Sequence, residues 1–299
     1  MRVFVTGASG LVGSALVPAL ARDGHDMWSM VRRAPNEGGR EVGWNPASGV
    51  EQAHALEGAD AVVHLAGESI AEGRWTDEKK RRIRESRVRG TRVLSEALAR
   101  LERPPQSLVC ASAIGFYGDR GDEILTEESA PGKGFLPDVC REWEAAADPA
   151  RERGVRVVHL RLGVVFSERG GALEKMLTPF KLGVGGTIGS GRQYMSWITL
   201  DDVIGIIRQA ILDERLIGPV NTVSPQPVTN LEFTKTLGRV LSRPTIFSVP
   251  AFAARLAFGE MADEALLASA RVEPARLKQS GYAFLYPELE SALRHVLKK

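Results

Sequence analysis

The chain has little cysteine and no apolar run long enough to cross a membrane. Cys110 and Cys140 are its two cysteines, and they stand in apolar or helical contexts at a separation that fits no zinc motif. Such a chain suits a reducing compartment and needs no disulfide. A bilayer span requires about twenty apolar residues. A signal peptide is not expected either, because strand-like residues begin at Arg2 in place of an apolar signal segment. We therefore expect a cytoplasmic protein with no membrane partner.

An excess of charge of either sign is also lacking, because 39 Lys and Arg residues face 37 Asp and Glu residues. A net charge of +2 gives no electrostatic reason to expect a nucleic-acid partner. The basic run 79–84 is flanked by Glu78 and Glu85, which is typical of a solvated helix face. No metal site is expected, because no two histidines stand at ligand spacing. The histidines are His25, His54, His64, His159 and His295.

What the sequence does contain is a regular alternation of strand and helix patterns in its first half. Short β-rich or continuously apolar runs predict strands at residues 2–5, 27–31, 61–65, 107–111 and 155–160. Helical patterns lie between them, among them a helix that ends at Gly24 and helices over 76–101 and 138–153. This order predicts an α/β fold, a Rossmann-type doubly wound parallel sheet.

The pattern changes after residue 166. Residues 167–195 are rich in glycine with few strand signals, and capping-box patterns begin at Thr199 and Thr229. A short strand near 219–224 is expected to return to the sheet. We predict a Rossmann domain over 1–166, joined by that strand, and a smaller mixed C-terminal substrate domain over 167–299.

The segment between the first strand and the first helix predicts a dinucleotide site. Gly7 permits a tight turn, Gly10 leaves room for a pyrophosphate, and Gly13 lets the helix pack closely on the strand. The backbone of Ser9, Leu11 and Val12 lies at the helix N-terminus, where free N–H groups favour phosphate. The position of this motif inside a strand–helix–strand unit makes it more specific than glycine spacing alone.

The end of the second strand indicates which dinucleotide is bound. An NAD-selective site usually places a carboxylate there, on the ribose hydroxyls. Here the strand is followed by Arg32 and Arg33, and Asp26 lies at its other end. Because guanidinium groups match phosphate geometry, the two arginines favour a 2′-phosphate and thus NADP(H). Ordinary surface charge is the alternative interpretation.

Several segments resemble the extended short-chain dehydrogenase/reductases, the group of sugar-nucleotide epimerases and dehydratases. They include 6–13, 63–67 and 116–119, and further segments such as 44–46, 74–76, 143–144 and 189–198 resemble an atypical "epimerase family" branch with a short C-terminal domain of unknown function. The resemblance covers essentially the whole chain. It implies that further residues line the cofactor: Leu65, Ala66, Gly67, Arg87, Leu162 and Gly163.

The chain departs from this family where catalysis is concerned. Typical members use a Tyr-x-x-x-Lys pair and a hydroxyl residue, but none of the four tyrosines here has lysine four residues later. The matching positions are Leu136 and Cys140, and the hydroxyl position falls on Ala113, one residue after Ser112. Neither leucine nor a neutral thiol replaces the missing acid/base chemistry.

Two functions therefore remain open. In the first, the protein is an NADP(H)-dependent oxidoreductase or epimerase for a small polar molecule such as a nucleotide sugar, and Ser112 or Tyr117 donates to a substrate oxygen. In the second, it is a catalytically weak or inactive NADPH-binding sensor or scaffold. Helices near 91–98 and 138–153 are also candidates for a homodimer seam.

Overall fold

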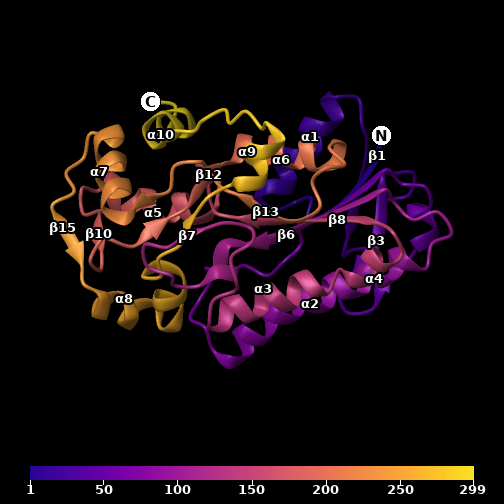
Figure 1. Ribbon diagram of the computed structural model, residues 1–299, viewed down its shortest axis with the longest axis horizontal. Helices are drawn as coiled ribbons and strands as arrows, with labels where there is room; N and C mark the ends of the chain where they lie inside the picture. Colours follow the sequence, from indigo (N-terminus) through magenta and orange to yellow (C-terminus); the bar gives the residue numbers. More distant parts are fainter.

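The computed structural model describes residues 1–299, and its centre is an eight-stranded sheet (Figure 1). The strand order is β13-β8-β6-β5-β1-β2-β3-β4, and every neighbouring pair is parallel except β3 with β4. The strands are β1 (Arg2–Thr6), β2 (Asp26–Val31), β3 (Glu41–Asn45), β4 (Gly49–Val50), β5 (Ala61–His64), β6 (Ser107–Ala113), β8 (Arg156–Leu162) and β13 (Gly218–Thr222). The predicted Rossmann-type fold is confirmed.

Helices cover both faces of this sheet, which explains why its central strands are apolar throughout. On one face lie α1 (Leu11–Arg22), α6 (Leu200–Leu212) and α9 (Ala275–Ser280), with Leu16, Ile206 and Leu277 in a common core. On the other lie α2 (Asp77–Ala99), α3 (Phe135–Ala145), α4 (Asp148–Glu152) and the 3-10 helix η1 (Ala53–Leu56), as Figure 1 shows for the three α-helices. The result is the three-layer arrangement of a doubly wound fold.

The helix predicted over 138–153 is in fact two helices. α3 ends at Ala145 and α4 begins at Asp148, with Pro149 in its first turn. In a continuous helix Pro149 would lack the N–H that bonds to Ala145 and would clash with that carbonyl. Here the carbonyl of Ala145 accepts instead from Arg92 Nη2 at 3.2 Å.

A second apolar core lies beyond the carboxyl edge of the sheet. It is built from α5 (Gly171–Lys181), α7 (Asn230–Leu241) and α10 (Leu289–Leu297) around the strand pair β9 (Val164–Phe166) and β12 (Trp197–Thr199). Phe166 stacks on Trp197 with ring centroids 5.1 Å apart. The remaining elements are η2 (Ile114–Tyr117), β7 (Ile124–Leu125), β10 (Gly186–Ile188), β11 (Tyr194–Met195), β14 (Val228–Thr229), β15 (Phe247–Val249), α8 (Ala251–Phe258), the π-helical turn η3 (Ala262–Leu266) and β16 (Arg271–Val272).

The second half of the chain contributes to both cores. The strand expected near 219–224 is β13, which pairs in parallel with β8 over 218–222. α6 packs beside α1, so residues 200–222 of the predicted second domain lie with the sheet. The division of the chain at residue 166 stays a prediction, and in space the sheet layer uses two separate stretches of sequence.

Both predicted helix caps are formed, with one difference. Thr229 and Glu232 make a complete capping box at α7. At α6, Thr199 accepts from the N–H of Asp202, but the Asp202 carboxylate accepts from the N–H groups of Leu285 (2.8 Å) and Tyr286 (3.2 Å). Asp202 therefore ties the C-terminal segment to the sheet layer rather than closing a local box.

Candidate functional site

The glycine loop between β1 and α1 has the close contacts that its spacing predicts. Gly7 has φ +69°, and a Cβ there would lie 2.9 Å from the nitrogen of Ala66. A Cβ on Gly13 would lie 2.2 Å from the Gly7 carbonyl oxygen, so α1 sits too close to the turn for any side chain. Gly10 is exposed, and a Cβ there would meet only the Gly7 carbonyl oxygen, at 3.3 Å, which is a tight contact and not a severe clash. Contacts within the protein therefore require glycine at positions 7 and 13, whereas at position 10 the lack of a side chain leaves space on the outside for a ligand.

The amino end of α1 opens into a hollow of about 230 Å³. Gly10 is the N-cap, no side chain caps the helix, and its first turn contains no acid. The unpaired N–H groups of a first helical turn carry partial positive charge. The hollow is lined by Ser9, Gly10, Leu11, Ser14, Ala15, Arg169, Gly170 and Leu200, whereas Val12 lies half-buried beside it. Such an end is suited to a phosphate group.

A buried chain of hydrogen bonds shapes the loop after β5. The Thr6 hydroxyl accepts from the N–H groups of Leu65 (3.2 Å) and Ala66 (3.3 Å), so its own proton is directed to His64 Nδ1 at 2.7 Å. His64 Nε2 then carries the ring proton and donates to Thr91 Oγ1 at 3.0 Å. Burial lowers the pKa of His64 to about 4, which keeps the ring neutral. Leu65 and Ala66 are thus held beside Gly7.

The two arginines after β2 have different environments. Arg33 forms a two-point ion pair with Glu41, at 2.6 and 3.0 Å, and Arg33 and a backbone N–H hold the pKa of Glu41 below its usual range. Arg32 is exposed, and its guanidinium makes no hydrogen bond or ion pair within the protein. No sequence pattern distinguishes the two arginines, because Glu41 reaches Arg33 through the pairing of β2 with β3.

Arg87, on α2, faces the loop after β5 rather than open solvent. Its guanidinium lies about 3.5 Å from where a Cβ on Gly67 would stand and over the Trp143 ring, 5.1 Å from the centroid. Burial lowers the pKa of Arg87, although the group keeps its charge. At the end of β8, Leu162 lies opposite Ala113 and Thr222 in the sheet, and the Gly163 N–H donates to Thr222. The predicted cofactor-lining residues therefore gather along the carboxyl edge of the sheet.

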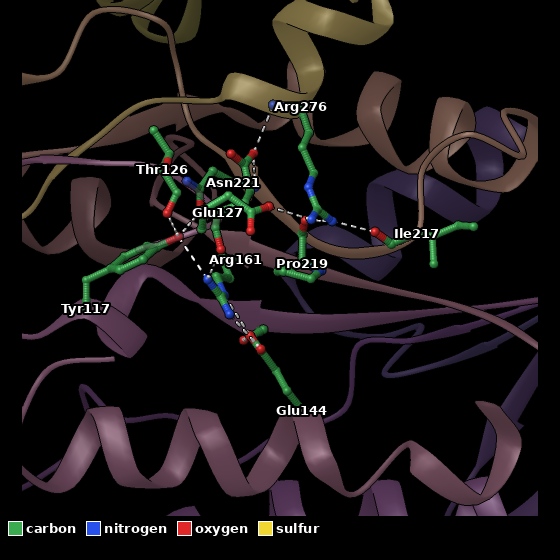
Figure 2. A network of polar contacts seen from close by, with 11 residues as sticks. Tyr117, Thr126, Glu127, Glu144, Arg161, Ile217, Pro219, Asn221 and Arg276 are labelled. Carbon is green, nitrogen blue, oxygen red and sulfur yellow. Dashed lines mark hydrogen bonds and ion pairs between the residues drawn. The ribbon is translucent and has the colours of Figure 1, made fainter. Parts of the chain in front are cut away.

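Tyr117 and Ser112, by contrast, lie inside the protein. Tyr117 is 0% exposed, and its Oη lies 2.7 Å from Asn221 Oδ1 and 2.9 Å from the Thr126 carbonyl while it accepts from Arg161 Nη1 (Figure 2). Burial raises the pKa of Tyr117, opposite to what an acid/base tyrosine needs. Ser112 is 2% exposed and donates to Glu144 Oε1 at 2.7 Å. Their action on a substrate stays a prediction, which this burial disfavours.

The network around Tyr117 is centred on an ion pair that the sequence did not reveal. Arg161 donates to both carboxylate oxygens of Glu144, at 2.9 and 2.8 Å (Figure 2). Burial alone would raise the pKa of Glu144, but the Arg161 guanidinium and the Ser112 hydroxyl hold it below its usual value. The available signals for Glu144 were its place in segment 143–144, which resembles the family, and its position one helical turn after Cys140 on α3.

Leu136 and Cys140, at the positions of tyrosine and lysine in typical relatives, also lie in apolar surroundings. A Cβ on Gly115 would stand 3.3 Å from Leu136 Cβ and 3.8 Å from Cys140 Sγ. Burial raises the pKa of Cys140 to about 12, so the thiol is neutral. These residues pack against η2 and supply no proton donor.

Together, the cradle at Gly7 and Gly13, the uncapped α1 and the parallel sheet define a dinucleotide-binding α/β protein of the Rossmann type. The chain belongs to the NAD dependent epimerase/dehydratase family, whose model matches residues 3–221. A second model, a domain of unknown function (DUF1731), matches residues 249–296. The expected membership of the epimerase branch with this C-terminal domain is confirmed.

Curated relatives match over nearly the full chain. Epimerase family protein Mb2239 of Mycobacterium bovis is 45% identical over 291 residues, covering 97% of this chain and 96% of the relative. Epimerase family protein SDR39U1 of Homo sapiens is 34% identical, covering 99% and 100%. The Arabidopsis thaliana homolog of SDR39U1, 37% identical over 100% of this chain and 87% of its own, is named chloroplastic, so a cytoplasmic location stays a prediction. No helix of the structure has the length and apolar character to cross a membrane.

Solved structures agree with this assignment. The human epimerase family protein SDR39U1, described as a crystal structure with NADPH, superposes with a TM-score of 0.91 at 33% identity and full coverage of both chains. A nucleoside-diphosphate sugar epimerase from Corynebacterium glutamicum gives a TM-score of 0.82 at 40% identity, covering 99% of this chain and 58% of that one. UDP-N-acetylglucosamine 4-epimerase of Bacillus cereus, at 18% identity over 99% and 98% of the two chains, shares the fold with a TM-score of 0.77.

Proposed function

We propose that this protein binds NADP(H) along the carboxyl edge of its sheet and acts as an oxidoreductase or epimerase-like protein on a small polar molecule, for which a nucleotide sugar is the candidate. The observation that carries the proposal is the outward-facing Gly10 at an uncapped helix, with the unpaired Arg32 near the adenosine side. The NADPH described for the human SDR39U1 structure supports it.

The residues present fit such a cofactor. Gly10 leaves room for a pyrophosphate at the amino end of α1, and Gly7 and Gly13 allow the tight turn there, with Ser9, Leu11 and Val12 beside it. Arg32, free of any carboxylate, would hold the 2′-phosphate, while Arg33 with Glu41 would shape the loop. The remaining proposed contacts are Leu65, Ala66, Gly67, Arg87, Leu162 and Gly163.

When bound, the nicotinamide supplies or accepts a hydride. The chain's own residues position it: the Thr6–His64 network holds the loop at Leu65 and Ala66, and Gly163 closes the end of β8. The proton donors proposed from the sequence are the hydroxyls of Tyr117 and Ser112, both enclosed by protein. Leu136 has no titratable group, and the Cys140 thiol stays neutral. The lack of an accessible proton donor among these residues favours a second candidate function, an NADPH-binding sensor or scaffold with weak or no turnover.

Calorimetric titration with NADPH and NADH tests the binding step. Wild-type protein should bind NADPH more tightly, and Arg32→Ala should weaken NADPH binding about ten- to hundredfold, the scale of a charged hydrogen bond, while NADH binding changes little. Gly10→Ala should still fold, because the added carbon meets only the Gly7 carbonyl oxygen, at 3.3 Å. It should bind neither coenzyme well, because Gly10 lines the hollow proposed for the pyrophosphate. Absence of saturable binding by wild-type protein would refute the proposal.

A turnover screen separates the two candidate functions. NADPH oxidation across carbonyl compounds and nucleotide sugars supports the enzyme, whereas tight binding without turnover supports the sensor. On any substrate found, Ser112→Ala and Tyr117→Phe should abolish turnover if these hydroxyls act directly. Unchanged turnover with a lowered free energy of unfolding would assign both residues to structure.

A homodimer through residues 91–98 and 138–153 remains part of the proposal. Charged side chains lie on the accessible faces of these segments: Arg92 and Glu96 are half-buried, and Arg141 and Arg151 to Arg153, with Glu152 between them, are exposed. Light scattering at several salt concentrations tests it, because a dimer held by charged faces should dissociate as salt rises.

A further inference from the structure

A loop from the second half of the chain lies against the first residue of α1. This loop, residues 167–171, follows β9 and leads into α5. A Cβ on Gly170 would stand 3.4 Å from Leu11 Cδ1, and one on Gly171, which has φ +80°, would stand 3.2 Å from Leu11 Cδ2. Paired glycines therefore allow the backbone of the loop to approach the glycine-rich turn closely.

The loop is also held in shape on its other side. Ser167 is buried, and its hydroxyl accepts from the N–H of Arg169 at 3.1 Å. Glu168 pairs with Lys298 Nζ at 2.9 Å, beyond the end of α10. Arg169 thus stands between two anchored stretches of backbone, and its position is set by the tertiary structure.

Arg169 lines the 230 Å³ hollow together with Ser9, Gly10 and Leu11. Its guanidinium makes no hydrogen bond or ion pair within the protein, whereas the nearby Glu168 and Lys298 are already paired. Arg169, whose charge has no hydrogen-bonded partner, and the positive end of α1 thus border the same hollow. Two positive groups placed so are favoured by an anion that lies between them.

We propose that Arg169 binds the pyrophosphate of the dinucleotide from the side opposite to α1. The inference rests on the proposed function, and it adds a contact from outside the glycine motif. The hollow borders the first turn of α1, where a Rossmann pyrophosphate lies, and not the end of β2, where Arg32 would meet a 2′-phosphate. Arg169 therefore contributes to the binding of both coenzymes, and Arg32 selects between them.

The test compares three arginine variants by calorimetry with NADPH, NADH and adenosine 2′-monophosphate, which has no pyrophosphate. Arg169→Ala should raise the Kd of NADPH and NADH by the same factor, about ten- to hundredfold, and leave adenosine 2′-monophosphate binding unchanged. Arg32→Ala should weaken NADPH and adenosine 2′-monophosphate but not NADH. Arg153→Ala, at an exposed arginine beyond α4 without side-chain partners, should change nothing.

Two further measurements sharpen the result. Arg169→Lys should recover part of the affinity, because a point charge replaces a two-point donor. The thermal midpoint of Arg169→Ala without coenzyme should lie close to that of wild type, since the guanidinium makes no hydrogen bond or ion pair within the protein. Wild-type affinity for both coenzymes in Arg169→Ala, or a loss confined to NADPH, would overturn the inference alone. Failure of wild-type protein to bind either coenzyme would overturn the proposed function and this inference with it.

Discussion

At the residue scale, the ionisation of His64 is coupled to folding because the ring lies neutral between two hydroxyl groups. Its pKa falls from the ordinary 6.5 to about 4 in the folded protein through burial. The unfolded chain therefore takes up a proton as pH falls below about 6.5, while the folded protein does not until about pH 4. The stability that neutral His64 contributes is present above about pH 6.5. It is lost as the pH falls from 6.5 to about 4, by up to ~3 kcal/mol in the free energy of unfolding.

Urea unfolding at pH 7.5 and 5 measures this effect. Other groups titrate in the same range, so the informative quantity is the difference between wild type and His64→Asn. The wild-type protein should lose more free energy of unfolding than the variant on acidification. Equal losses would show that His64 carries a proton in the folded state.

The buried pair Arg161–Glu144 should depend strongly on both partners. Arg161→Met leaves Glu144 buried and uncompensated, and we expect a loss of ~3–5 kcal/mol in the free energy of unfolding. The matched control is Arg294→Met, whose partner Glu290 is 42% exposed, with an expected loss of at most ~0.5 kcal/mol. The double variant Arg161→Met with Glu144→Leu should be more stable than Arg161→Met alone. Equal effects of the two single changes would contradict the assigned burial.

Residues also differ in how far the sequence revealed their roles. Gly7 and Gly13 were predictable because a turn and a helix start impose their geometry within a few residues. Tyr117 was a candidate donor from its place beside the expected cleft, yet Thr126, Arg161 and Asn221 enclose its hydroxyl. Those partners come from three separate segments, so no local pattern shows them.

At the scale of elements, α3 is capped by a residue that is distant in sequence. Its N-cap, Gly134, has no side chain, and the carboxylate of Glu264 on η3 accepts from the N–H groups of Phe135 and Leu136, each at 3.1 Å. A carboxylate at this position also favours the positive end of the helix. Glu264 therefore links the C-terminal segment to α3.

We expect Glu264→Ala to lower the free energy of unfolding by ~1 kcal/mol and to speed amide exchange in the first turn of α3. Asp263→Ala is the matched control, because Asp263 lies on the same turn η3 as Glu264 but pairs only with the exposed Arg255 on α8. Hydrogen exchange of both variants checks the prediction. Faster exchange at α3 in the Asp263 variant, or none in the Glu264 variant, would argue against the cap.

At the scale of the whole molecule, the sheet layer requires residues from the second half of the chain. β13 forms the edge next to β8, and α6 buries Val203, Ile206 and Ile207 against the sheet. We expect residues 1–166 alone to lack cooperative unfolding in urea and a near-ultraviolet dichroism signal. A chain ending at residue 297 should keep both, because it lacks only two exposed lysines. Cooperative folding of 1–166 would establish that segment as an independent domain.

The sequence by itself determined the alternation of strands and helices, the glycine cradle and the absence of the tyrosine–lysine pair. Each of these depends on residue type and short spacing, which act on the backbone locally. The prediction missed the helix break at Pro149, although the proline is a local signal for it, and it missed helix α5, which lies in a glycine-rich stretch.

Tertiary structure alone decided which charges are free. Glu41 neutralises Arg33 and leaves Arg32 available because β3 pairs beside β2. Arg161 and Glu144 neutralise each other inside the protein, while Arg169 stands unpaired beside the first turn of α1, more than 150 positions away in the sequence. Electrostatic partners are set by distance in space, and in a parallel sheet with long crossovers that distance does not follow from separation along the chain.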